Sequence, residues 1–149
     1  MFYSIVLILH NLWRWLVVLA AAWVLVRAWS GWLGKRPWTK TDQRAGMLFG
    51  ISLDLQFLLG LILAIISPLM QAAYQDLGAL AMQAPFRTFL MEHMPIMFVA
   101  LILAHVGSAL SRKGADDAAK HRRAAIWFSV TVLLIAVAIP WSRPLIRFF

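Results

Sequence analysis

Two histidines are the most informative of the ionisable side chains that lie inside long apolar stretches of this sequence. His10 lies in the first stretch, and His93 lies near the start of the third. At 1.5 Å per helical residue, His10 lies about 8 Å and His93 about 6 Å inside the start of its stretch. If both stretches run in the same direction, the two imidazoles lie at similar depth. Such a pair, facing across a helical bundle, can ligate the iron of a b-type haem.

Arg14 follows His10 by four residues, so both side chains lie on one face of the helix that Val17, Ala21 and Val24 continue. Its guanidinium is expected to pair with a haem propionate or with Glu92. A second interpretation of the two histidines stays open. Each imidazole would then lie in the membrane interface or pack between helices, hydrogen-bonded to water or to the backbone.

Two further ionisable residues lie deeper in the apolar stretches. His105 follows His93 by twelve positions, or about 18 Å along a helix, so one haem cannot use both. We expect His105 to pack as a polar residue or to contact a quinone. Asp54 lies in the middle third of the second stretch, and Arg14 is its expected partner. Asp54 is then part of a structural ion pair, a buried neutral acid, or an acid of a proton relay or quinone site.

Two local patterns affect how these residues are placed. Gln56 points about 200° away from Asp54 around the same helix, and with Ser52, Gly60 and Ala64 it forms a small, polar seam suited to close helix contact. Pro95 either kinks a helix that begins at residue 89, or lies in the first turn of a helix that begins at residue 94. In the second case Glu92 and His93 lie in the entry loop.

The composition excludes several classes of protein. The chain has 149 residues, of which 62% are hydrophobic and only 13% charged, and its mean hydropathy is +0.78. A soluble domain of this size could not bury so much apolar surface, which disfavours a soluble enzyme, a disordered chain and a nucleic-acid binder. The sequence has no cysteine, so disulfides, thiolate metal sites and c-type haem attachment are excluded.

Four apolar stretches predict four membrane-spanning helices, at about residues 5–28, 47–67, 89–110 and 124–140. No segment alternates with the period of a strand. The expected fold is therefore all-α, an integral membrane four-helix bundle that forms one domain over residues 1–149. Gly31, Gly34 and Pro37 are expected to end the first helix.

The basic residues indicate how the bundle is oriented. Ten of the fourteen lie at the first and third connections, whereas the second connection holds only Arg87 and the C-terminal tail only Arg143 and Arg147. The positive-inside rule places the first and third connections in the cytoplasm and both termini on the periplasmic side. The charge of +8 is thus explained by topology, and His121 is expected at the headgroups among basic residues.

Several phrases of the sequence resemble small bacterial four-helix membrane proteins labelled cytochrome b or cytochrome b561-like. The phrases are residues 9–15 (LHNLWRW), residues 55–61 (LQFLLGL) followed by Ser67 and Pro68, the pair Glu92 and His93, and residues 120–124 (KHRRA). The resemblance covers about residues 8–130. It implies an electron carrier that binds haem b between its helices, and it points to His10 and His93, with His121 also in a matched phrase.

The chain departs from this family pattern at Asp54, where the second helix of the family often has histidine. If that histidine ligates haem in the relatives, its replacement implies a member that has lost haem and serves as an accessory subunit of a larger complex.

The first interpretation is a b-type cytochrome-like electron-transfer protein of the bacterial inner membrane. It would carry electrons between a quinol pool and other membrane subunits of a respiratory or photosynthetic complex. The alternative is a cofactor-free structural accessory subunit of such a complex. A stand-alone enzyme is disfavoured, because the sequence has no GxSxG, HExxH, Walker or GxGxxG motif.

Overall fold

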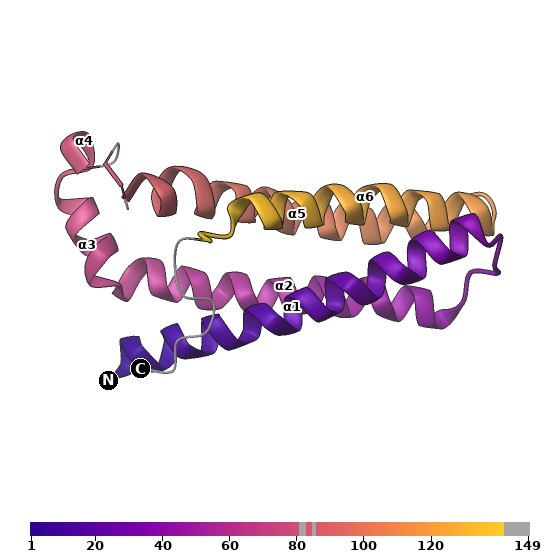
Figure 1. Cartoon of the computed structure of the whole chain (residues 1–149), viewed down its shortest axis with the longest axis horizontal. Coiled ribbons are helices and arrows are strands. Elements are labelled where there is room, and N and C mark those ends of the chain that lie inside the picture. Colours follow the sequence, from indigo (N-terminus) through magenta and orange to yellow (C-terminus); the bar gives the residue numbers. More distant parts are fainter. Residues whose placement is uncertain (81–82, 85, 142–149) are drawn as a thin grey trace.

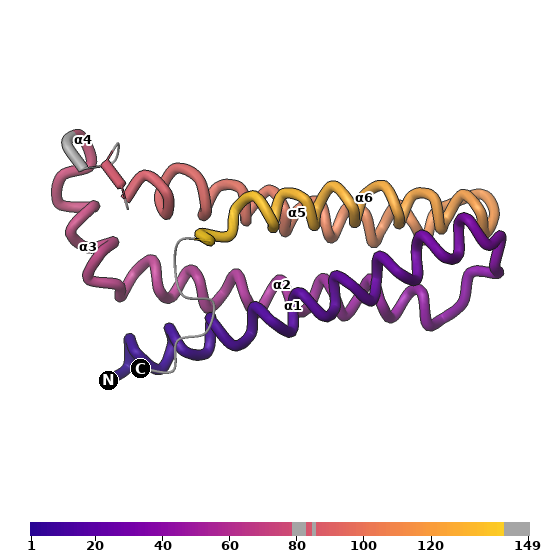
Figure 2. The backbone as a smooth tube through the Cα atoms, in the orientation of Figure 1, coloured from indigo at the N-terminus to yellow at the C-terminus, as the bar shows by residue number. Residues whose placement is uncertain are grey.

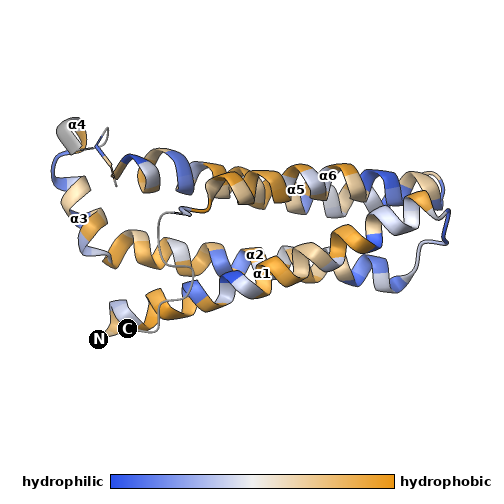
Figure 3. Cartoon of the chain, in the orientation of Figure 1, coloured by the Kyte–Doolittle hydropathy of each residue, from blue (hydrophilic) through white to orange (hydrophobic). Residues whose placement is uncertain are grey.

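The computed structural model describes residues 1–80, 83–84 and 86–141, and within this part of the chain all regular secondary structure is helical. Four helical segments are long and apolar enough to cross a membrane, which indicates a multi-pass protein in a lipid bilayer. Figure 3 shows the apolar character along these helices and the polar connection at one end. The elements in chain order are α1 (Phe2–Leu33), α2 (Lys40–Ile66), α3 (Pro68–Gln75), α4 (Leu77–Leu80), the π-helix η1 (Thr88–His93), α5 (Met94–Arg112) and α6 (Asp117–Ala138).

The long helices extend beyond the four predicted spans mainly at one end of the bundle, although α1 also begins earlier than predicted, at Phe2. Relative to those spans, α1 ends later and α2 begins earlier, and the same is true of α5 and α6. We call this end, which carries the 34–39 and 113–116 connections, the basic end. The helices continue there through polar and basic residues, beyond the apolar stretches. Helix α1 continues through Gly31 and ends at Leu33, with Gly34 as its C-cap, so of the residues predicted to end the helix Gly34 does so and Gly31 does not.

The bundle consists of two helical hairpins, α1–α2 and α5–α6, as Figures 1 and 2 show. Each hairpin packs along its length, α1 also packs against α6, and α2 packs against α5. We call the end opposite the basic end, where α1 begins and α6 ends, the cavity end. Helix α3 follows α2 there, with Met70 and Ala73 buried.

Small side chains allow the two hairpins to approach closely through the middle of the bundle and toward the basic end. Ala45, Ala100, Ala104, Ala124 and Ala125 are all at most 1% exposed. The larger rings of Phe49 and Phe128 meet edge to face among them, 5.8 Å apart. Small interface residues of this kind favour close helix contact within lipid.

The packing is different at the cavity end. Between Val6 and Val17, α1 buries no residue, and α2 buries none between Gln56 and Ala64. Helix α5 buries none before Met97. The helices therefore remain around a space at this end, in which candidate site residues lie.

An ion pair fastens α1 to the start of α2 at the basic end. The Arg27 guanidinium lies 2.8 Å from Oδ1 of Asp42, which is only 4% exposed. Oδ2 of Asp42 accepts hydrogen bonds from the backbone N–H and the hydroxyl of Thr39, at 2.8 and 2.6 Å. Asp42 thus caps α2 and binds α1 at the same time.

The helix that carries His93 begins with a π-helical segment rather than a loop. Pro95 has no N–H, so it cannot donate to the carbonyl of Met91. Instead, the N–H of Met94 donates to the carbonyl of Phe89, five residues back. Pro95 therefore lies in the first turn of α5, as one of the two predictions had it, whereas His93 lies in the π-helix and not in an entry loop. Short π-helical segments are frequent at functional sites.

We expect Asp42→Ala to lower the free energy of unfolding by about 2–4 kcal/mol, because it removes a helix cap and leaves Arg27 without its carboxylate. Denaturant titration of the detergent-solubilised protein measures this loss. The control is Asp117→Ala, whose exposed pair with Lys120 should contribute less than about 0.5 kcal/mol. Equal losses in the two variants would contradict a fastening role for Asp42.

Candidate functional site

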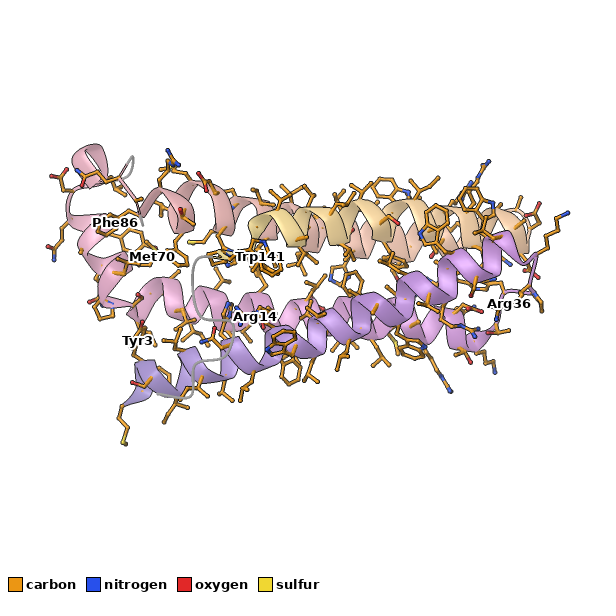
Figure 4. All side chains as sticks on the ribbon, viewed as in Figure 1. Tyr3, Arg14, Arg36, Met70, Phe86 and Trp141 are labelled. Carbon is orange, nitrogen blue, oxygen red and sulfur yellow. The ribbon has the colours of Figure 1, made fainter. Side chains whose placement is uncertain are left out.

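A cavity of about 440 Å³ lies between the two hairpins at the cavity end. Its size is within the roughly 300–1,000 Å³ of typical ligand sites. Figure 4 shows Arg14 and Met70 in the space between the hairpins, whereas Arg36 lies at the opposite end of the bundle. The walls are mainly apolar, and the polar side chains include His10, Asn11, Arg14, Gln56 and His93.

The structure brings His10 and His93 together across this cavity. Their ring centroids are 6.5 Å apart, and the ring planes are inclined by 74°. The parallel course of α1 and the η1–α5 helix produces this juxtaposition, as the depth argument predicts. Asn11, Arg14 and Val17 continue the wall along α1.

Each imidazole has one nitrogen in a hydrogen bond and one nitrogen without a bond to the described residues. Nδ1 of His93 lies 2.8 Å from the carbonyl oxygen of Ala138, to which it donates, and this leaves Nε2 unprotonated. The amide of Gln56 lies 3.1 Å from Nε2 of His10 and also donates to the His10 carbonyl at 3.1 Å. Nδ1 of His10 is buried and has no partner, and neither has Oε1 of Gln56.

Gly60 lies against the His10 ring. A Cβ atom built at Gly60 would lie 3.4 Å from Cε1 of His10, which is ordinary van der Waals contact, so alanine fits there and a larger side chain would press on the ring. Gly60 belongs to the predicted seam, of which Ser52, Gln56 and Ala64 are buried. The seam faces α1, since Trp13 also donates to the carbonyl of Ser52 at 2.9 Å.

The geometry of this pair fits axial ligation of one metal ion. Two imidazoles that share a metal ion have centroids about 6 Å apart, since each metal–nitrogen bond is about 2 Å and each centroid lies about 1 Å behind its nitrogen. The observed 6.5 Å is close to this value. The donation from Nδ1 of His93 to a backbone carbonyl is the usual support of a metal-bound histidine. Nε2 of His10 instead accepts from the Gln56 amide, so Nδ1 of His10 carries the ring proton in this arrangement and would have to lose it to bind a metal ion.

The predicted partners of two acidic residues are wrong. Glu92 pairs with Arg87, at 3.1 Å, rather than with Arg14. Oδ1 of Asp54 lies 2.8 Å from Nε2 of His105 rather than next to Arg14. The reason is rotation about α2: Gln56 faces α1, so Asp54, about 200° away, faces α5.

The Asp54–His105 pair lies on the outer side of the bundle and joins α2 to α5. The side chains are 46% and 54% exposed. Gly50 on α2 leaves room beside the His105 ring, and the rings of Phe57 and Phe98 lie 5.8 Å apart in the same pair of helices. Ionisable groups at this depth in a membrane are costly unless they contact water, protein or a polar ligand, so the pair is a second candidate site.

Two hydrogen bonds in the site are not predicted by the sequence analysis. The first joins Gln56, predicted only as part of a packing seam, to His10. The sequence does indicate that Gln56 lies on the helix face of Ser52 and Gly60, opposite Asp54. The carbonyl of Ala138 that fixes His93 gives no sequence signal, because a backbone group does not depend on residue type. Among the described residues, no group of three or more His, Cys, Asp or Glu residues could hold a metal ion.

No protein family, curated protein or solved structure matches this chain. The case for a function therefore depends on the geometry of the two candidate sites.

A double-mutant cycle tests the pairing in the second site. Asp54→Ala and His105→Ala should be coupled by about 1 kcal/mol in unfolding free energy, the range measured for polar pairs between membrane helices. Arg14→Ala and Asp54→Ala should be additive within about 0.5 kcal/mol. Coupling of Asp54 to Arg14 but not to His105 would contradict the geometry described here.

Proposed function

We propose that this chain is a b-type cytochrome-like electron-transfer protein, whose cavity between the hairpins would hold one haem b, with His10 and His93 as the residues that would bind its iron. The observation that carries the proposal is the pair of imidazoles 6.5 Å apart across an apolar cavity, each with a nitrogen that binds no described residue. When bound there, haem would accept and release single electrons. The chain's own residues position and insulate it.

The roles of these residues follow from their contacts. Ala138 and Gln56 orient the two imidazoles through hydrogen bonds. Arg14, one helical turn from His10 in the cavity wall, is positioned to interact with a propionate. Gly60 lies in contact with the His10 ring and limits the size of the side chain that fits beside it.

The Asp54–His105 pair supports a role with quinol. The Asp54 carboxylate accepts a hydrogen bond from Nε2 of His105, so Nδ1 of that ring is the acceptor nitrogen. Nδ1 can accept a hydrogen bond from a quinol hydroxyl that reaches the pair from the bilayer, and the carboxylate holds the ring in the tautomer that accepts it. Asp54 thus acts as the orienting group of a histidine base.

The same exposed pair also favours a second candidate, a cofactor-free accessory subunit. In that case another membrane subunit of an electron-transfer complex covers the exposed Asp54–His105 pair on α2 and α5. The two histidines of the cavity, His10 and His93, then serve only in packing. The two candidates differ in an observable property, because only the first binds haem.

The proposed location is the bacterial inner membrane, with both termini on the periplasmic side. This orientation is supported by the many basic residues on the connections and helix ends at the basic end, compared with few at the cavity end. The proposed haem then lies near the periplasmic side, where a partner subunit can exchange electrons with it.

Absorption spectra of the detergent-purified protein test the haem proposal. The wild type, expressed with haem supplied, should show the Soret and sharp reduced α bands of a low-spin b-type haem. His10→Ala or His93→Ala should abolish or convert this spectrum, because an axial bond is lost. A wild-type protein without haem would overturn the proposal in favour of the accessory subunit.

His105→Ala is the matched control, since this residue lies about 18 Å along the helix from His93. It should leave the low-spin spectrum intact but slow the reduction of the protein by a soluble quinol analogue. Loss of the low-spin spectrum in this variant, with retention in the other two, would mean that the ligands are assigned to the wrong histidines.

Reporter fusions test the topology separately. A reporter active only in the cytoplasm should be inactive when fused after Phe149 and active when inserted at Gly114, in the connection between α5 and α6. The reverse pattern would contradict the proposed orientation.

A further inference from the structure

A second, smaller cavity lies at the basic end and is independent of the haem proposal. It has a volume of about 140 Å³ and is bounded by the end of α1, the start of α2 and the first turns of α6. The residues that matter for its chemistry are Arg27, Gly31, Arg36, Thr39, Asp42 and His121. It is too small for a haem or a quinone, whose sites are usually larger than about 300 Å³. It has room for a group the size of a few water molecules, at about 30 Å³ each.

His121 is the unusual residue of this cavity. Its side chain is only 1% exposed, yet neither ring nitrogen has a hydrogen-bond partner among the described residues. The edge of the ring that carries both nitrogens lies against Gly31, where a Cβ atom would overlap it. The ring of Trp38 contacts His121 edge to face, with centroids 4.8 Å apart. An imidazole buried without a partner is costly, which indicates that a polar group completes the site.

The charges around the cavity favour an anion as this group. The carboxylate of Asp42 is occupied on both oxygens, Oδ1 by Arg27 and Oδ2 by Thr39. Its negative charge is therefore balanced within the cavity wall. Arg36 adds a further positive charge from the 34–39 connection, and His121 adds a ring N–H donor. A guanidinium together with neutral donors suits a phosphate oxygen.

The place of the cavity in the bundle indicates where the phosphate comes from. The cavity lies at the basic end, where the long helices extend past the predicted apolar stretches and where we expect a bilayer to place its headgroups. Basic pockets between membrane helices on such a side bind anionic lipid headgroups. We propose that the cavity around His121 and Arg36 binds a phosphate group, supplied by the phosphodiester of an anionic phospholipid. Free inorganic phosphate offers the same chemistry, so the experiment separates the two sources.

The experiment is a thermal-unfolding titration of the full chain in detergent micelles. The probes are short-chain phosphatidylglycerol, short-chain phosphatidylcholine and inorganic phosphate, the last against chloride at equal ionic strength. A ligand that binds only the folded state raises Tm with its concentration. We expect phosphatidylglycerol, whose headgroup has a net negative charge, to raise Tm much more than phosphatidylcholine, whose choline cation offsets the charge of the same phosphodiester. A rise with inorganic phosphate but not with phosphatidylglycerol would support the phosphate site and overturn the lipid as its source.

Matched variants locate the effect. Arg36→Gln should weaken the apparent affinity for phosphatidylglycerol at least about tenfold, the size expected for one charge-assisted hydrogen bond. Arg44→Gln removes the same charge from an exposed position of α2 outside the cavity and should change the affinity less than about twofold. His121→Phe should also weaken binding. Equal effects of Arg36→Gln and Arg44→Gln, or no rise in Tm with either phosphate source, would overturn the proposal.

Discussion

The close approach of the two hairpins near the basic end is the constraint on which the other features depend. Within lipid, helix contacts gain little from hydrophobic burial and depend on tight packing. Alanines on α2, α5 and α6 supply that packing, and the Arg27–Asp42 pair fastens α1 to α2 at the same end. Toward the cavity end α1 buries no residue between Val6 and Val17, and α2 buries none between Gln56 and Ala64. The helices there therefore enclose a cavity instead of a filled core.

The cavity places a small set of polar groups where a membrane protein can tolerate them. A lipid-facing imidazole would be costly, whereas one that faces the bundle interior can be paired with protein groups. The π-helix before α5 contributes to this arrangement, since Pro95 prevents the normal backbone bond and His93 lies in the wider turn that results. On the opposite wall, Gly60 packs against the His10 ring and Gln56 forms a hydrogen bond with it.

The spans could be predicted from the sequence because helix length and apolarity are local properties that the bilayer thickness limits. The meeting of His10 and His93 could also be predicted, since depth along parallel helices follows from residue spacing alone. The partners of Asp54 and Glu92 could not. These partners depend on which helices are neighbours in the bundle and on how each helix is rotated about its axis. The sequence of a single helix determines neither. Gly31 illustrates the same limit, because its role against His121 depends on a residue 90 positions away.

Low-temperature electron paramagnetic resonance of the oxidised protein tests the central claim most directly, because the signal of a low-spin haem depends on the angle between its two axial imidazole planes. The planes of His10 and His93 are inclined by 74°. The account predicts the highly anisotropic low-spin signal of nearly perpendicular imidazoles, lost on replacement of either histidine. The rhombic signal of parallel imidazoles, a high-spin signal, or no haem signal in the haem-supplied wild type would contradict it.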